Sequence, residues 1–113
     1  MASDPIKILI VDDDERVLID LERLLESEGY STATAWGGRE ALALSQKTRF
    51  DLLLVDEHLA DLDSTTLLEG LRRSQPKACH LVMHTHSERR STTGVCKWEH
   101  SEMKARIRSC LTA

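Results

Sequence analysis

Two apolar runs of the sequence each end on aspartate. Ile6–Val11 leads into Asp12–Asp14, and Asp51–Val55 leads into Asp56. If both runs are neighbouring strands of a parallel sheet, their carboxyl ends meet at one edge, where such sheets bind ligands. Carboxylates gathered there repel each other unless a cation lies among them, and Mg²⁺ prefers hard oxygen ligands together with a phosphate. The spacing therefore predicts a metal-assisted phosphoryl site.

Two further side chains have the chemistry to serve such a site. Thr85 ends another apolar run and offers a hydroxyl, and Lys97 offers a point cation for a phosphoryl oxygen. Each also has an ordinary interpretation, Thr85 as a strand residue and Lys97 as a solvated charge. For Asp14 the ordinary interpretation is favoured, because an aspartate at a helix start accepts hydrogen bonds from free N–H groups.

The elements that must position these side chains alternate between strand and helix patterns. Short β-branched runs predict buried strands, whereas Val17–Leu25 carries apolar residues at helical spacing and Gly29 stops that helix. This alternation is typical of an α/β domain with a parallel sheet. Strands are expected at residues 6–11, 30–36, 51–55, 79–85 and 95–96, and helices at 14–28, after 38, from 63 or 64 to 74, and at 101–111.

Length and charge restrict the class of protein. The 113 residues fit one domain, residues 1–113, and 41% apolar with 30% charged residues is ordinary globular composition. The net charge of -4 and the scattered basic residues argue against nucleic acid as a direct partner. Apolar runs such as Ile8–Val11 are too short for a membrane span. A soluble cytoplasmic protein is expected.

The cysteines are an odd set with no close pair in sequence: Cys79, Cys96 and Cys110. This fits buried thiols in a reducing compartment better than a disulfide framework, so they are expected to be packing residues. A transition-metal site is an alternative use of cysteine and histidine here, although the spacing matches no compact zinc pattern. The histidines concerned are His80, His84, His86 and His100.

With its acidic residues in this order, the sequence resembles the receiver domains of response regulators. The segments ILIVDDDE, DLLLVDEHLADLD, VMHT and CK occur in that family's order between Ile6 and Lys97, most of the chain. The resemblance implies a doubly wound, flavodoxin-like α/β fold with a five-stranded parallel sheet in the order 2-1-3-4-5.

The resemblance also implies roles for single residues. Asp12 and Asp13 match the family's acidic pair, and Asp56 matches the phosphoacceptor. Thr85 matches the switch hydroxyl, and Lys97 matches the basic residue that contacts the phosphoryl group.

By the same likeness the cofactor is Mg²⁺. Asp13 and Asp56 would bind it directly, and the main-chain carbonyl of His58 would complete the site beside Asp12.

The implied function is a signalling switch rather than an enzyme. Asp56 would take a phosphoryl group from the phosphohistidine of a sensor histidine kinase or phosphotransfer protein. The acyl phosphate would draw Thr85 inward and change the surface that partners read. The partners implied are a downstream output protein or a second copy of the chain, and neither nucleic acid nor a membrane.

The chain departs from the family pattern near the expected site. The family usually has Pro and Gly after the acceptor, where this chain has Ala60 and Ser64, so a less rigid loop is expected. Beside Lys97, Cys96 replaces an aromatic residue and Trp98 replaces a proline, which puts aromatic coupling to the switch hydroxyl in doubt.

The connection His86–Gly94 is the largest departure. It is polar throughout and shorter than the dozen or so residues that a helical crossover needs. The fourth helix is therefore predicted to be missing or reduced to a turn. An uncovered sheet edge there would favour an unusual dimer.

Two alternative functions stay beside the phosphoacceptor. A degenerate receiver that docks a partner without phosphate is favoured by the lost helix, whereas the intact acidic set favours phosphotransfer. A metal-dependent phosphatase lacks a second acid pair after Asp56. Trp36 and Trp98 are expected to be packing or interface residues rather than platforms for nucleic-acid bases.

Overall fold

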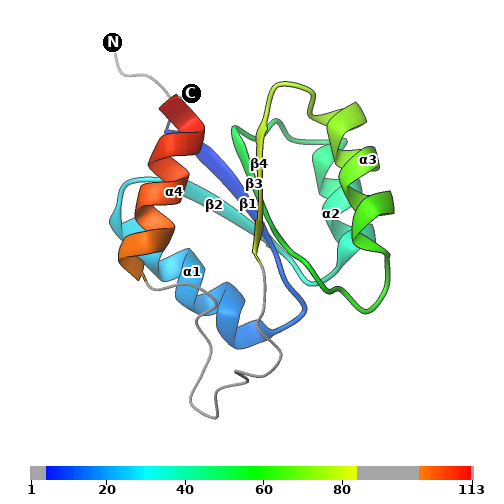
Figure 1. The fold of residues 1–113 in the computed structure, drawn as a ribbon, viewed down its shortest axis with the longest axis horizontal. Helices are drawn as coiled ribbons and strands as arrows, with labels where there is room; N and C mark the ends of the chain where they lie inside the picture. The colour runs from blue at the N-terminus through cyan, green and yellow to red at the C-terminus, as the bar shows by residue number, and fades with distance from the viewer. Residues whose placement is uncertain (1–4, 84–99, 113) are drawn as a thin grey trace.

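The computed structural model describes residues 5–83 and 100–112 of the chain. Its described strands form a four-stranded, all-parallel sheet in the order β2-β1-β3-β4 (Figure 1). This confirms the parallel α/β fold and the order of its first four strands. The strands are β1 (Lys7–Val11), β2 (Ser31–Ala35), β3 (Leu52–Asp56) and β4 (Cys79–Met83).

The predicted fifth strand at Val95–Cys96 and the shortened connection His86–Gly94 lie outside the described residues. The described sheet therefore has four strands where five were expected.

Helices cover both faces of the sheet, as a doubly wound fold requires. On one face lie α1 (Glu15–Ser27) and α4 (His100–Thr112), and on the other lie α2 (Gly38–Ser45) and α3 (Ser64–Ser74) (Figure 1). No helix in the described part of the chain is long and apolar enough to cross a membrane.

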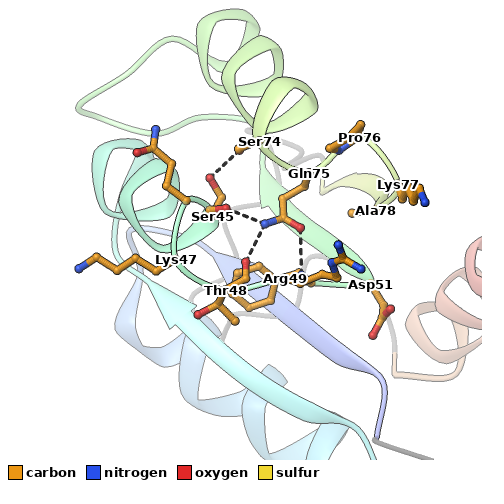
Figure 2. A pocket seen from close by; sticks show the side chains of 12 residues that line it. Ser45, Lys47, Thr48, Arg49, Asp51, Ser74, Gln75, Pro76, Lys77 and Ala78 are labelled. Carbon is orange, nitrogen blue, oxygen red and sulfur yellow. Dashed lines mark hydrogen bonds between the residues drawn. The ribbon is translucent and has the colours of Figure 1, made fainter.

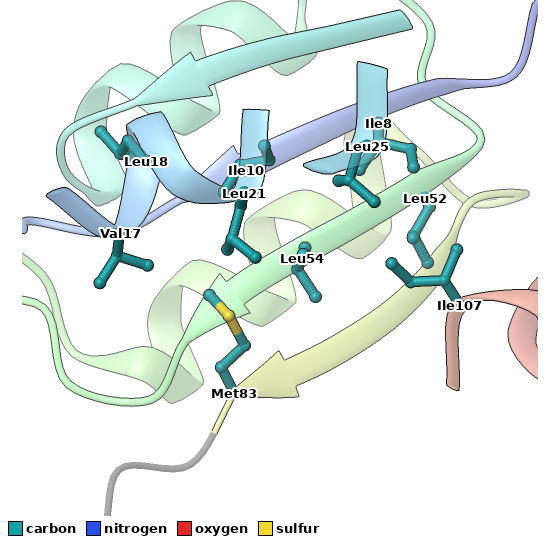
Figure 3. Packing of buried hydrophobic residues seen from close by; sticks show 10 residues of the cluster. All are labelled: Ile8, Ile10, Val17, Leu18, Leu21, Leu25, Leu52, Leu54, Met83 and Ile107. Carbon is teal, nitrogen blue, oxygen red and sulfur yellow. The ribbon is translucent and has the colours of Figure 1, made fainter. Parts of the chain in front are cut away.

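The two central strands are buried on both faces. In β1, Ile8 and Ile10 pack against α1 (Figure 3). Leu9 and Val11 pack on the α2 and α3 side. Successive strand side chains point to opposite faces, so a continuous apolar run is what a doubly covered strand needs. These runs are the reason that the aspartates after them have fixed positions.

Helix α1 begins and ends within one residue of the predicted range 14–28. Asp14 is its N-cap, and its carboxylate accepts a hydrogen bond from the main-chain N–H of Arg16 at 3.0 Å. Gly29 follows with φ of 93°, a left-handed conformation that favours glycine. Of the predicted apolar face, Leu24 is partly buried, and the other four residues are buried: Val17, Leu18, Leu21 and Leu25.

The expectation that the cysteines are unpaired is wrong for two of them. Cys79, the first residue of β4, forms a disulfide with Cys110 in α4. The two are 31 residues apart, and only the packing of α4 beside β4 brings them together. Cys96 lies outside the described residues.

A hollow of about 410 Å³ lies at the end of the sheet where β3 and β4 begin, between the α2–β3 and α3–β4 connections (Figure 2). Beside it, buried Gln75 ties the two connections together. Its amide nitrogen donates to the carbonyls of Ser45 and Thr48, both at 2.7 Å, and its amide oxygen accepts from the N–H of Phe50 at 3.0 Å. Gln75 is thus fully occupied in a structural role.

Replacing Gln75 should destabilise this end of the domain. Gln75→Ala leaves buried main-chain groups without partners, so we expect the free energy of unfolding to fall by about 1–3 kcal/mol. Gln46→Ala, a matched change at an exposed glutamine of the same hollow, should stay within about 0.5 kcal/mol of the wild type. Urea denaturation followed by circular dichroism measures both, and equal losses would contradict the assigned role.

Candidate functional site

Three carboxylates converge at the carboxyl ends of the central strands. Asp12, Asp13 and Asp56 each offer one carboxylate oxygen, and these oxygens lie within 4.8 Å of one another. Asp12 is 0% exposed and Asp56 is 2% exposed, whereas Asp13 faces solvent. The convergence predicted from the sequence is therefore present, with two of the three charges buried.

The register of β1 and β3 produces this convergence. Val11 is paired with Val55, so Asp12 and Asp56 follow at the same level of the sheet. Ile10 and Leu54 lie two residues earlier and face α1, and the alternation of strand side chains directs both aspartates to that same face. A one-residue slip of β3 would send Asp56 to the opposite side.

Main-chain hydrogen bonds hold both strand ends. The N–H of Asp12 donates to the carbonyl of Ala35 in β2 at 3.1 Å. Asp56 is paired with Met83 in β4, and the N–H of Glu57 donates to the Met83 carbonyl at 2.9 Å. The sheet ladder thus extends through both aspartates and fixes their backbones.

The three consecutive aspartates Asp12–Asp14 have different roles. The N–H of Asp14 donates to Asp12 Oδ1 at 2.9 Å, which orients the Asp12 side chain. Asp14 itself caps α1, as predicted, and does not belong to the cluster. Asp12 and Asp13 are therefore the members of the triplet that meet Asp56.

The loop after Asp56 is fastened by a residue that the sequence analysis missed. Asp61 accepts hydrogen bonds from the main-chain N–H groups of Gly38 at 2.9 Å and Arg39 at 3.1 Å, at the start of α2. These donations hold the pKa of Asp61 below its ordinary value of 3.8. The β3–α3 loop is consequently tied to α2 despite Ala60 standing in place of a proline.

Two glycines permit this close approach. A Cβ on Gly37 would lie 2.9 Å from the Asp61 carboxylate oxygens, and one on Gly38 would lie 2.8 Å from the Leu62 Cβ. Larger residues would push the loop away from α2. The Gly-Gly pair at a helix start was the available sequence signal for this contact.

Trp36 lies beside the acidic cluster rather than in the core. Its side chain is 71% exposed, and it shares a hollow of about 340 Å³ with Asp13, Ala60 and Asp61. Its main-chain N–H donates to Glu40 Oε1 at 2.7 Å, which strengthens the start of α2. Trp36 is thus not a packing residue of the core. It lines the same hollow as Asp13.

Of the remaining predicted site residues, the structure describes His58. His58 lies in the β3–α3 loop two positions after Asp56, with its side chain exposed. Thr85 and Lys97 lie outside the described residues, as do His84 and His86 of the transition-metal alternative. Within the described residues, no histidine or cysteine joins a group of three potential metal ligands.

The donor set of the cluster suits a hard divalent cation. All three ligand groups are carboxylates, and burial of two of them places negative charge where water screens it poorly. Mg²⁺ and Ca²⁺ prefer such oxygen ligands, whereas zinc prefers nitrogen and sulfur.

The family of the chain follows from comparison with known proteins. The family model for the response regulator receiver domain matches residues 8–101, which include Asp12, Asp13 and Asp56. The chain belongs to this family. Receiver domains are signalling domains of two-component response regulators.

One curated relative is the response regulator receiver protein Anae109_2439 of Anaeromyxobacter sp. (strain Fw109-5). It is 40% identical over 80 residues, which are 71% of this chain and 34% of that protein. The chain therefore spans about a third of the length of this relative.

Solved receiver domains have the same fold. The CheY-like receiver domain protein from Methanospirillum hungatei JF-1 superposes with a TM-score of 0.83 at 26% identity, covering 96% of this chain and 95% of that one. A response regulator from Burkholderia pseudomallei has a TM-score of 0.69 at 33% identity, covering 72% of this chain and 48% of its own. That structure contains a phosphorylated aspartic acid, a calcium ion and citrate.

Removing the Asp61 carboxylate should loosen the β3–α3 loop of this receiver. At pH 7 we expect Asp61→Ala to lower the free energy of unfolding by about 1 kcal/mol, the usual effect of losing a helix cap. Asp61→Asn should lose less, because its amide oxygen still accepts a hydrogen bond. Urea denaturation of the three proteins measures the differences.

The pH dependence gives an internal check. Because the folded-state pKa of Asp61 is lowered, its contribution is complete above its unfolded pKa and is lost as pH falls through the folded pKa. The gap between wild type and Asp61→Ala should be constant from about pH 8 to pH 5 and shrink below that range. A stability difference between wild type and Asp61→Ala that widens at low pH would contradict the assigned role of the Asp61 hydrogen bonds.

Proposed function

We propose that this receiver domain accepts a phosphoryl group on Asp56, in the presence of Mg²⁺, and thereby switches a partner interaction. The observation that carries the proposal is the convergence of Asp12 and Asp13 on Asp56, with Asp56 at the end of a buried strand. The phosphorylated aspartic acid in the Burkholderia pseudomallei relative supports it.

The metal assignment rests on the same carboxylates. Asp13 and Asp56 would bind Mg²⁺ directly, with the main-chain carbonyl of His58 as a further ligand and Asp12 beside them. When bound, the ion supplies positive charge that offsets the charge of the carboxylates and of the incoming phosphoryl group. The Burkholderia pseudomallei structure contains a calcium ion together with a phosphorylated aspartic acid, which supports a divalent cation in this proposal.

The chain's own contribution to transfer is position and charge. A carboxylate oxygen of Asp56 forms a bond to phosphorus as the bond between phosphorus and the donor imidazole nitrogen breaks, and the imidazole takes up a proton. The ladder through Glu57 and Met83 holds Asp56 for in-line attack. The Asp61 contact keeps the loop beside it closed over the start of α2.

The sequence alone suggests Thr85 and Lys97 as two further residues of the phosphoryl site. Lys97 would contact the phosphoryl oxygens, and Thr85 would hydrogen-bond to the product and move inward. The added charge of the acyl phosphate would then change the surrounding loops.

The partners follow from the chemistry. The donor would be the phosphohistidine of a sensor histidine kinase or phosphotransfer protein in the cytoplasm. The receiver of the signal would be an output protein or a second copy of the chain, with no direct contact to nucleic acid or membrane.

Phosphotransfer can be tested by intact-mass spectrometry after incubation with acetyl phosphate. We expect a Mg²⁺-dependent gain of one phosphoryl mass in the wild type and in Asp20→Asn, an exposed aspartate of α1 that serves as control. Asp56→Asn should show no gain. The absence of an adduct in the wild type, under conditions that label an ordinary receiver, would favour phosphate-independent docking instead.

Metal binding can be tested on its own, because an ion that binds only the folded state raises its stability. We expect Mg²⁺ to raise the urea midpoint of the wild type and to change the fluorescence of Trp36, which shares a hollow with Asp13. Asp13→Asn should weaken Mg²⁺ binding at least about tenfold.

Asp14→Asn is the matched control for the metal test, because asparagine also caps a helix and Asp14 lies outside the cluster. It should bind Mg²⁺ as the wild type does. Without Mg²⁺, Asp13→Asn should be at least as stable as the wild type, since one of three repelling charges is gone. Equal weakening by both substitutions would refute the assigned ligand set.

A further inference from the structure

A disulfide bond joins helix α4 to the sheet. Cys110 in its last turn is bonded to Cys79 at the start of β4, with the two Cα atoms 6.1 Å apart. That separation lies inside the range that disulfides accept without movement of the backbone. Both side chains are partly buried against the core cluster under α1, so the pair is within reach of small reagents.

The described side chains of α4 are less deeply buried than those of α1. Among its described side chains, Ile107 is the only one that is fully buried (Figure 3), whereas α1 buries Val17, Leu18, Leu21 and Leu25. Leu111 packs against the same core cluster but is only partly buried, so the described side chains of α4 bury less apolar surface than those of α1.

The ion pairs of α4 add little. Lys104 lies 3.1 Å and Arg108 lies 3.7 Å from the carboxylate of Glu28, and all three side chains are in contact with solvent. Solvent-exposed ion pairs of this kind contribute little to stability. The Cys79–Cys110 bond adds a covalent attachment of this helix to the sheet.

We propose that Cys79 and Cys110 are a reversible thiol–disulfide pair that latches α4 to the sheet. The oxidant would be a low-molecular-weight disulfide such as oxidised glutathione. The Cys79 and Cys110 thiols release two protons and two electrons as their S–S bond forms, and the small disulfide takes these up as its own S–S bond breaks into two thiols. In a reducing compartment such pairs form transiently and serve redox sensing.

The latch is independent of the proposed phosphotransfer. Cys79 is paired with Leu52, at the opposite end of β4 from Met83, which is paired with Asp56. Oxidation therefore changes the attachment of α4 without contacting the acidic cluster. In the oxidised chain a detached helix would stay tethered close to its site, because the bond closes the loop between residues 79 and 110.

The test compares the wild-type chain equilibrated in oxidised and in reduced glutathione. Intact-mass spectrometry should show loss of two hydrogen masses on oxidation, and peptide mapping should assign the bond to Cys79 and Cys110. Hydrogen exchange should slow at least about tenfold in residues 100–112 on oxidation and stay unchanged in α1. Acetyl phosphate labelling should be the same in both states.

Cys96→Ser should behave as the wild type, whereas Cys110→Ser should show fast exchange of α4 in either buffer. Because the main comparison uses one wild-type protein in two buffers, it does not depend on the folding of a variant. A bond that involves Cys96, a bond that reduced glutathione never opens, or equal exchange of α4 in both states would each overturn the latch.

Discussion

The parallel pairing of β1 with β3 is the constraint on which the site depends. It aligns Val11 with Val55, so the next residues, Asp12 and Asp56, come level and face the same side of the sheet. Both strands are covered on both faces, so a slip of one residue would exchange the side chains that are packed on the two faces and would separate the carboxylates. The hydrophobic core therefore enforces the geometry of a polar site that contributes little apolar contact of its own.

The acidic end of the domain is stabilised by hydrogen bonds from main-chain groups. Asp14 caps α1, Asp12 accepts from Asp14, and Asp61 accepts from the start of α2. Helix starts favour negative charge, so these contacts suit an end of the sheet that gathers carboxylates. They also explain how a loop with Ala60 and Ser64 in place of proline and glycine keeps its position: the carboxylate of Asp61 fastens it to α2.

The opposite end of the sheet is held differently. Gln75 joins two connections through neutral hydrogen bonds, and Cys79 joins the sheet to α4 through sulfur. The proposed phosphoacceptor, Asp56 of β3, and the proposed redox latch at Cys79 of β4 consequently lie at opposite ends of the β3–β4 pair. One end would respond to phosphorylation and the other to thiol oxidation, with the apolar strands between them.

The sequence by itself determined the parallel α/β fold, the cap at Asp14, the stop at Gly29 and the convergence of Asp12 and Asp13 with Asp56. These follow from local periodicity and from the rule that parallel strands present their carboxyl ends at one edge. Thr85, Lys97 and the fifth strand lie outside the described residues and stay predictions. Only the tertiary structure decided the contact of Asp61 with α2, the Cys79–Cys110 bond and the place of Trp36 beside Asp13. Each of these joins segments far apart in sequence, and their meeting depends on how helices pack on the sheet, which no local pattern encodes.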